Sequence, residues 1–282
     1  MASKIVVQKR YKKRSDWRGL LAVSRDVSFL FGAWYVAVWW GHYPWVAFVT
    51  VLWVGVLQFA MGESLLHEAS HNNLFRRRWL NKVVGQIIAH AILTTLSTWR
   101  SEHRTHHGKL LTEADHLTHD YRAYELGVGV HPFVLWIWRP FSGWVGLQWL
   151  RSEGPGLWKH IGVFIFYALV LAVVAYLGVL YYFLLYWVLP LVWIYPAILY
   201  WSEITDHYGA EQHSRSNTSF IWNFLFHNGG YHWVHHEYPF IPWYLLPAAN
   251  EALAPQNSDH VQGWWAMNQV LCADYWKHQQ ST

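Results

Sequence analysis

The chain has 282 residues, 54% of them hydrophobic and 19% aromatic, whereas only 13% are charged. A soluble domain carries about 25% charged residues, so this composition excludes an ordinary soluble protein and predicts a polytopic membrane protein. The single cysteine, Cys272, excludes an intrachain disulfide and any cysteine-based zinc or iron–sulfur site. Much of the net charge of +4 lies in residues 1–16. We interpret them as a mobile cytosolic tail that sets membrane topology, rather than as a nucleic-acid-binding patch.

Two apolar stretches follow the basic tail, at about residues 19–40 and 45–66, and turn residues 41–44 separate them. Because a helix needs about 20 residues to cross the hydrocarbon core, each stretch can form one span. Together they predict a helical hairpin over about residues 19–66. A basic stretch at residues 76–82 follows, and basic residues are enriched in cytoplasmic loops, so the hairpin is predicted to begin and end on the cytoplasmic side.

The longest apolar stretch covers residues 161–201 and contains no lysine, arginine, aspartate or glutamate. Its length is about twice what one span needs, so we expect a second hairpin that turns near residues 178–182. The sequence thus predicts a single all-α membrane domain with four transmembrane helices. Residues 67–160 and 202–282 remain for a cytosolic helical cap, on the side where both hairpins begin and end.

Three histidine clusters lie in the segments assigned to the cap. The first reads H-x-x-x-H, and the other two read H-x-x-H-H. Residues three and four apart share one face of a helix, so each cluster directs several imidazoles the same way, and imidazole is the commonest metal ligand. Eight such rings exceed the three or four ligands that one zinc ion takes, so a site for two metals is expected. The predicted ligands are His67, His71, His103, His106, His107, His232, His235 and His236.

Two further histidines are candidate ligands because of their positions. His207 lies just after the second apolar stretch, where an ionisable group is functional by default. His227 precedes the third cluster by five residues, and two intervening glycines would allow a close approach. A metal-bound histidine usually donates its other N–H to a carboxylate or a carbonyl. The candidate carboxylates are Glu63, Glu102, Asp115, Glu203 and Asp206. The histidines expected to have structural roles are His42, His90, His131, His160, His213, His260 and His278, while His116 and His119 are expected to be structural or to contact a ligand.

Histidine clusters of these three forms, in this order and with hydrophobic hairpins before the first and the last, resemble those of the membrane fatty acid desaturase superfamily. The resemblance covers about residues 45–239, and residues 227–239 are similar to the wider sequence around the last cluster of such enzymes. Members are four-span proteins whose cytosolic cap holds two irons. The first cluster, H-x-x-x-H, is closer to the acyl-lipid and bacterial branch than to the acyl-CoA desaturases, whose first cluster is H-x-x-x-x-H. In its position His207 matches a further ligand of the acyl-CoA enzymes.

The resemblance implies an O2-dependent, non-haem di-iron oxidoreductase that inserts a double bond into an apolar, fatty acyl chain held in the bilayer. Its cofactors would be two iron ions, with O2 as co-substrate and the eight cluster histidines as ligands. His131-Pro132-Phe133 is not the haem motif of a fused cytochrome b5 domain, so a separate electron carrier of the ferredoxin, rubredoxin or cytochrome b5 type is expected. We expect a multi-pass protein with its site on the cytoplasmic side, in a bacterial inner membrane rather than the endoplasmic reticulum, and no nucleic-acid partner.

Three other functions remain open. A hydroxylase or monooxygenase acting on a lipid, an alkane-like compound or a carotenoid would use the same site, and no residue type distinguishes it from a desaturase. His67-Glu68-Ala69-Ser70-His71 also fits the H-E-x-x-H pattern of zinc metalloproteases, with Glu68 as the base, but this leaves two clusters without a role. A metal transporter would need liganding residues within its spans, and residues 161–201 carry no charged residue.

Overall fold

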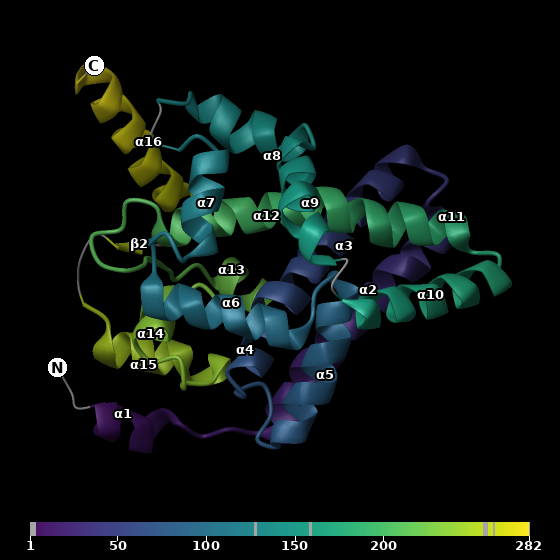
Figure 1. The fold of residues 1–282 in the computed structure, drawn as a ribbon, viewed down its shortest axis with the longest axis horizontal. Coiled ribbons are helices and arrows are strands. Elements are labelled where there is room, and N and C mark those ends of the chain that lie inside the picture. Colours follow the sequence, from purple (N-terminus) through teal and green to yellow (C-terminus); the bar gives the residue numbers. More distant parts are fainter. Residues whose placement is uncertain (1–3, 127–128, 158–159, 256–258, 262, 282) are drawn as a thin grey trace.

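The computed structural model describes residues 4–126, 129–157, 160–255, 259–261 and 263–281, and it is mostly helical (Figure 1). The first elements along the chain are α1 (Lys4–Tyr11), α2 (Asp16–Trp40), α3 (Pro44–Ala60), the π-helical turn η1 (Met61–Leu66), α4 (His67–Ser70), α5 (Arg78–Ala91), α6 (Leu96–Lys109), α7 (His116–Ala123), the π-helical turn η2 (Val134–Trp138), α8 (Arg139–Phe141) and α9 (Trp144–Leu157). They are followed by α10 (Ile161–Tyr176), α11 (Leu180–Phe183), the π-helical turn η3 (Leu184–Val188), α12 (Leu189–His207), α13 (Phe220–Leu225), α14 (His232–Glu237), the 3-10 turn η4 (Trp243–Leu245), α15 (Leu246–Leu253) and α16 (Gly263–Ser281). The strands β1 (Ser216–Asn217) and β2 (His260–Val261) form a short parallel pair.

Three helical segments in the described part of the chain are long and apolar enough to cross a membrane. They are Asp16–Trp40, Pro44–Ser70 and Leu180–His207. The fourth segment expected to span, α10, has only 16 residues, fewer than the about 20 that a hydrocarbon core requires. Three of the four predicted spans are therefore supported within the described residues. The long apolar stretch divides unequally because the chain reverses at Gly178, whose φ of +67° suits a glycine that ends a helix.

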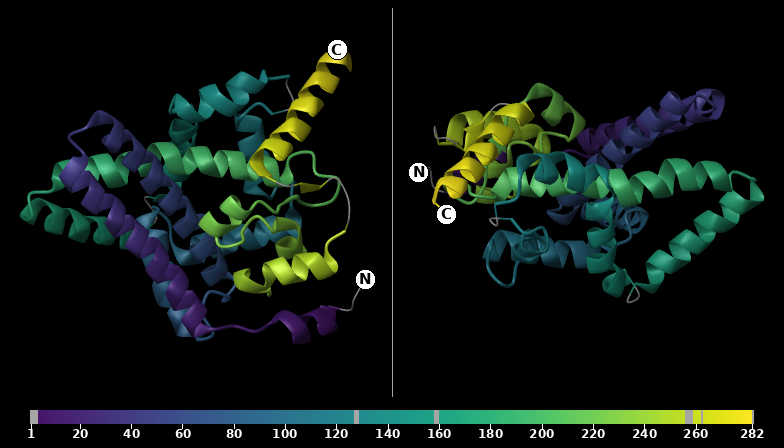
Figure 2. Two further views of the ribbon diagram at one scale, coloured as in Figure 1. Left: turned by 180° about the vertical axis from the view of Figure 1, so that it is seen from behind. Right: turned by 90° about the horizontal axis from the view of Figure 1, so that it is seen from above.

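The two hairpins place all three histidine clusters at one end of the molecule. Figures 1 and 2 show both hairpin turns at one end, whereas α4, α6 and α14 lie toward the other end. Helix α3 packs against both α2 and α12, and so joins the two hairpins. A Cβ on Gly55 of α3 would lie 2.3 Å from Cβ of Ile194, so glycine is needed for this close approach. The hairpins thereby bring the end of α3 beside the end of α12.

A second close contact lies beside Pro196, inside α12. Proline has no N–H, so the carbonyl of Val192, four residues earlier, has no partner in a regular helix. Helix α9 packs at this point, and a Cβ on Gly146 would lie only 2.0 Å from that carbonyl oxygen. Glycine therefore lets α9, part of the wall of the cap, lie directly against α12.

The N-terminal segment is not a free tail over its described residues. Helix α1 buries Val7 and Tyr11, which are 2% and 5% exposed, against Trp233, Val234 and Leu246 of the C-terminal cap. Val7 and Tyr11 are four residues apart and therefore share one helical face, which the composition-based interpretation of a mobile tail overlooked. The basic N-terminal segment thus packs behind the third histidine cluster.

Candidate metal centre

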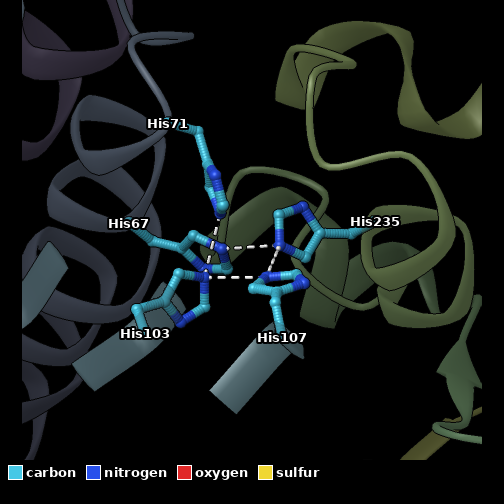
Figure 3. A group of neighbouring side chains, drawn as sticks. All are labelled: His67, His71, His103, His107 and His235. Carbon is cyan, nitrogen blue, oxygen red and sulfur yellow. Dashed lines mark hydrogen bonds between the residues drawn. The ribbon is translucent and has the colours of Figure 1, made fainter. Parts of the chain in front are cut away.

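The three histidine clusters converge with His207 into two adjacent groups of ring nitrogens. The five-histidine group is shown in Figure 3 and consists of His67, His71, His103, His107 and His235. The four-histidine group consists of His106, His207, His232 and His236. Within each group, one ring nitrogen per residue lies within 4.8 Å of all the others. Both H-x-x-H-H clusters therefore contribute to both groups.

Helical spacing explains how each cluster divides. His103 and His107 are four residues apart on α6 and enter the five-histidine group together, while His232 and His236 on α14 enter the four-histidine group together. In each cluster the remaining histidine directly precedes the second member of the pair. It lies about 100° around the helix from that member, so it points into the other group.

The five-histidine group has its rings turned toward a common centre. The Nε2 atoms of His67 and His235 lie 2.7 Å apart, and those of His71 and His103 lie 2.9 Å apart. Nε2 of His107 lies 2.9 Å from that of His103 and 3.1 Å from that of His235. The same ring atom of each residue faces inward, as ligands of one ion would.

Burial keeps these rings neutral, which leaves each with a lone pair for a metal. Burial first, and then the charges of the neighbouring imidazoles such as His67 and His106, lower the pKa of His107 to about 3. The pKa of His71, His103 and His235 lies well below its usual value, first because of burial and then because of the surrounding imidazoles. The group therefore presents uncharged nitrogen donors at neutral pH.

In the four-histidine group, two rings are fixed through their outer nitrogen. Nδ1 of His207 lies 2.9 Å from the backbone carbonyl oxygen of His213, and Nδ1 of His106 lies 3.2 Å from Oδ1 of Asp115. Both contacts leave Nε2 for the group, and Nε2 of His207 lies 2.9 Å from that of His232. This is the arrangement in which an outer hydrogen-bond partner orients a metal ligand.

Asp115 was predicted as such a partner from its sequence position. Burial by itself would raise its pKa, but the hydrogen bond and charge of His106 and the backbone N–H of Leu111 outweigh burial, and the pKa falls to about 2. The Leu111 N–H donates to Oδ2 over 2.8 Å. Asp115 is therefore an anion that is fully buried beside His106.

The donor set fits two metal ions. Nε2 of His236 is buried and has no hydrogen-bond partner, a state that costs free energy unless a cation accepts its lone pair. Imidazole suits iron, zinc and copper, and neither group contains a carboxylate. The rings of His107 and His236 stack with their centroids 4.2 Å apart, so the two groups are direct neighbours.

The other predicted carboxylates have different contacts. The carboxylate of Glu63 accepts a 2.8 Å hydrogen bond from the Tyr195 hydroxyl, while its backbone carbonyl oxygen lies 3.3 Å from Nδ1 of His67. Oε1 of Glu203 lies 3.9 Å from Nε2 of His116, and Asp206 accepts a hydrogen bond from Ser202. Glu102 lines the cavity described below. Glu63 thus reaches its histidine through the main chain, in a π-helical turn, a feature frequent at functional sites.

The structure places His227 outside both groups. Its Nε2 lies 2.8 Å from Oδ2 of Asp26 and 2.7 Å from Nη2 of Arg25, both on α2. The backbone at His227 and Asn228 is left-handed, with φ of +47° and +60°, and the chain turns there. The geometry does not support the predicted ligand role of His227, because its ring contacts α2 instead.

One contact could not be read from the sequence. His213 was assigned a structural role, yet its backbone oxygen holds the ring of His207. A carbonyl is present in every residue, so no residue type signals this function. His116 is adjacent to the four-histidine group, with Nδ1 3.5 Å from Asp115, and His119 contacts the backbone oxygen of Glu113.

A cavity of about 420 Å³ reaches both histidine groups. It touches His67 and His103 of the first group, and His106, His207 and His232 of the second. Its aromatic wall consists of Phe59, Trp99, Tyr124, Trp149, Tyr195, Trp222 and Phe226. Largely apolar pockets with a few placed polar groups are typical of small-molecule sites, so this cavity is the candidate substrate site.

Comparison with known proteins identifies the family of the chain. The family model for fatty acid desaturases matches residues 43–268. The chain belongs to the fatty acid desaturase family. This membership confirms the resemblance that the histidine clusters carry.

Similar proteins include plant desaturases. The chain is 26% identical to a chloroplastic omega-3 fatty acid desaturase of Ricinus communis, over 86% of the chain and 60% of that protein. It is 35% identical to an sn-2 acyl-lipid omega-3 desaturase (ferredoxin) of Arabidopsis thaliana, over 33% of the chain and 21% of that protein. A Sesamum indicum omega-3 fatty acid desaturase is also 35% identical, over 33% of the chain and 21% of that protein. The chain thus spans about 60% of the Ricinus protein and less of the other two.

Proposed function

We propose that the chain is a membrane-bound, O2-dependent di-iron oxidoreductase that introduces a double bond into a fatty acyl chain. The observation that carries this proposal is the opening of both histidine groups onto one aromatic-walled cavity. A substrate in that cavity would lie beside both metals. The membrane character of three helical segments and the family of the chain support an apolar, lipid substrate.

Bound iron would supply the activation of O2 and the removal of hydrogen from an unactivated C–H bond. The protein's own residues fix the geometry. Asp115 and the backbone oxygen of His213 accept the Nδ1–H of His106 and His207, which directs Nε2 of both rings inward. The aromatic wall would hold an apolar chain and orient it. Overall, –CH2–CH2– plus O2, two electrons and two protons gives –CH=CH– plus two waters.

The family of the chain and the activities of its relatives support proposals for the substrate and the electron donor. The Arabidopsis relative is named as an acyl-lipid enzyme that uses ferredoxin. We propose an acyl lipid as the substrate and a separate one-electron carrier as the donor, with the site on the cytoplasmic side of the membrane. A bacterial inner membrane stays a prediction, and all three relatives described above are named as chloroplastic proteins.

The contacts of Glu68 disfavour a metalloprotease. Such an enzyme needs this carboxylate beside the metal-bound water, but Oε2 of Glu68 accepts a 3.0 Å hydrogen bond from the backbone N–H of Trp243. Glu68 is 4% exposed and belongs to neither histidine group. Hydroxylation would use the same site, and product mass distinguishes it from desaturation.

The proposal is tested by iron content and lipid products of the full chain. Purified protein should hold about two irons per chain. Lipids of cells that express the protein should contain acyl chains lighter by about two mass units, whereas hydroxylation would add about sixteen. His106→Ala and His235→Ala should lose iron and product together, one from each group. His42→Ala is the matched control, because His42 is exposed beside the turn between α2 and α3.

Two results would contradict the proposal. Full iron loading in both ligand variants would show that these rings do not hold the metals. A wild-type protein with two irons and a reducing system that leaves every lipid unchanged would contradict the lipid substrate while leaving the metal site intact.

A further inference from the structure

Two arginine side chains lie near His71, and three further arginines continue from them. The arginine group consists of Arg14, Arg18, Arg78, Arg100 and Arg104. Arg14 and Arg100 are close enough for their charges to act on the His71 ring. Arg100 donates hydrogen bonds to the backbone oxygens of Ser70 and Ala69, the two residues before His71, over 2.8 and 3.2 Å.

The remaining members extend this positive surface. The positive charge of Arg78 lowers the pKa of Arg14, and that of Arg104 lowers the pKa of Arg100, so neighbouring members of the group repel each other. Arg18 stacks over the Tyr244 ring with its guanidinium carbon 4.4 Å from the ring centroid. Arg18, Arg78 and Arg104 are exposed, and Arg14 and Arg100 are partly exposed. The group therefore presents several free guanidinium N–H donors to solvent.

Carboxylates do not balance these charges within the described part of the chain. No ion pair there joins any member of the arginine group to an aspartate or glutamate. Glu68, whose charge acts on Arg14, is bonded to the Trp243 N–H, and Asp16 is paired with Arg77. The adjacent histidine groups are neutral, so bound divalent metals would add further positive charge. Such a concentration of one sign attracts an anionic partner from solution.

None of the five arginines of this group lines the cavity. His67 and His103 line the cavity, whereas His71, which is partly exposed, is not among its lining residues. His71 also contributes its Nε2 atom to the inward-facing ring of nitrogens, 2.9 Å from that of His103. One imidazole thus connects the arginine surface to the proposed metal, and substrate in the cavity would leave that surface accessible.

We propose that the arginine group is the docking surface for a small acidic iron–sulfur protein, which delivers electrons to the metal centre at His71. This inference rests on the proposed function, because only a redox reaction requires such a partner. Each docking oxidises one reduced cluster and transfers one electron, so two dockings supply the two electrons for each double bond. The two protons come from water.

The chemistry of the surface favours this partner. A guanidinium binds carboxylates in a two-pronged geometry, as an aspartate- and glutamate-rich protein surface offers. Anionic lipid headgroups also bind arginines at the ends of spans. Arg14 and Arg18 stand at the start of the spanning segment Asp16–Trp40, where such headgroups would lie, but Arg100 and Arg104 lie on α6, among the cap's own histidines and away from the ends of the spanning segments. Their position beside a predicted ligand favours an electron donor over a lipid.

The test uses the full chain in neutral lipid nanodiscs with a reduced acidic [2Fe–2S] ferredoxin as the donor. Arg18→Glu and Arg78→Glu remove two exposed members that do not neighbour a histidine ligand in sequence. At low ionic strength each change should lower the bimolecular rate of ferredoxin oxidation by about tenfold, with a smaller effect at high salt. Turnover driven by a small-molecule reductant such as reduced methyl viologen should be unchanged, which also shows that the variants are folded.

Lys277→Glu is the matched control, because it reverses one exposed charge on α16, a helix that projects away from α5 (Figure 1). It should leave the ferredoxin rate unchanged. Recovery of the rate in Arg78→Glu by a ferredoxin with an acidic residue changed to lysine would support direct docking. Equal ferredoxin rates in wild type and both arginine variants would overturn the proposal, as would lost binding to anionic vesicles with a normal ferredoxin rate. A wild type inactive with both reductants would contradict the proposed function instead.

Discussion

The two histidine groups are neighbours but are built differently. The five-histidine group combines two pairs at i, i+4 spacing with His235, and its member His71 reaches the protein surface. The four-histidine group has one such pair, and its two single members come from α6 and from the end of α12. Both singles are fixed through Nδ1 by Asp115 and by the His213 carbonyl.

This difference shows two ways to preorganise a metal site. Where helical pairs dominate, the backbone itself aligns the rings, and few outer partners are needed. Where single residues from distant elements meet, each ring has more rotational freedom, so an outer hydrogen bond fixes its orientation. Metal binding by the four-histidine group should therefore depend more strongly on each ligand and on the hydrogen bonds that its ligands make through Nδ1.

The largest effect is expected from removing a member of the smaller group. His232→Ala leaves three nitrogens, so iron should fall from about two to about one per chain, with a loss of turnover of more than about 100-fold. His71→Ala removes a partly exposed ring with one close nitrogen neighbour, His103, whereas the buried His235 has two, so His71→Ala should keep both irons with a loss of turnover of about tenfold. Metal analysis and lipid turnover of both variants check this order. Equal iron loss in the two variants would refute the asymmetry.

Asp115→Asn tests the outer contact of His106. The amide keeps the size and the helix-capping oxygen but loses the negative charge that orients and polarises the ring, so iron affinity should fall by about 10–100-fold. Competition with a chelator measures this affinity. Glu113→Gln is the control, because Glu113 is exposed and pairs with Arg122 at the surface. Unchanged affinity in Asp115→Asn would mean that His106 needs no outer partner.

Acid should destabilise the metal-free protein in two pH windows, an upper one in which buried histidines of both groups gain protons on unfolding and a lower one that belongs to Asp115. The pKa of His107 is about 3 when folded and near 6.5 when unfolded, so the unfolded state binds more protons and stability falls as pH drops from 6.5 toward 3. The pKa of Asp115 is about 2 against 3.8, so its contribution is present above pH 3.8 and is lost as pH falls toward 2. Unfolding midpoints measured between pH 6.5 and 2 report both contributions to stability. His107→Gln should reduce the dependence of stability on pH only between pH 6.5 and 3. An unchanged dependence there would contradict the lowered pKa of His107.

The smallest effect is expected from His213→Ala. Its contact with His207 uses the backbone oxygen, which alanine retains, so iron content should change by less than about twofold. His227→Gln should also retain about two irons, because its ring contacts Asp26 and Arg25 rather than a histidine group. Iron analysis checks both. A large loss in His213→Ala would show that its side chain, stacked 5.8 Å from His236, matters more than its carbonyl.

Much of the candidate site could be predicted from short-range patterns. Nine of the ten histidines expected to bind metal meet in the two groups, and Asp115 lies against one of them. The fold was predicted less completely. Apolar length indicated two hairpins, but the position of Gly178 divides the second one unequally, and α10 is shorter than a span. Hydropathy measures total apolar length and is insensitive to where a turn falls within it.

The sequence by itself determined which histidines could act together, because residues four apart on a helix share a face wherever that helix packs. It also determined the membrane character and the family of the chain. Only the tertiary structure decided which group each single histidine joins, that His227 contacts α2, and that α1 packs behind the third cluster. These outcomes depend on the packing of elements far apart in the chain and on backbone carbonyls, which every residue has and no residue type marks.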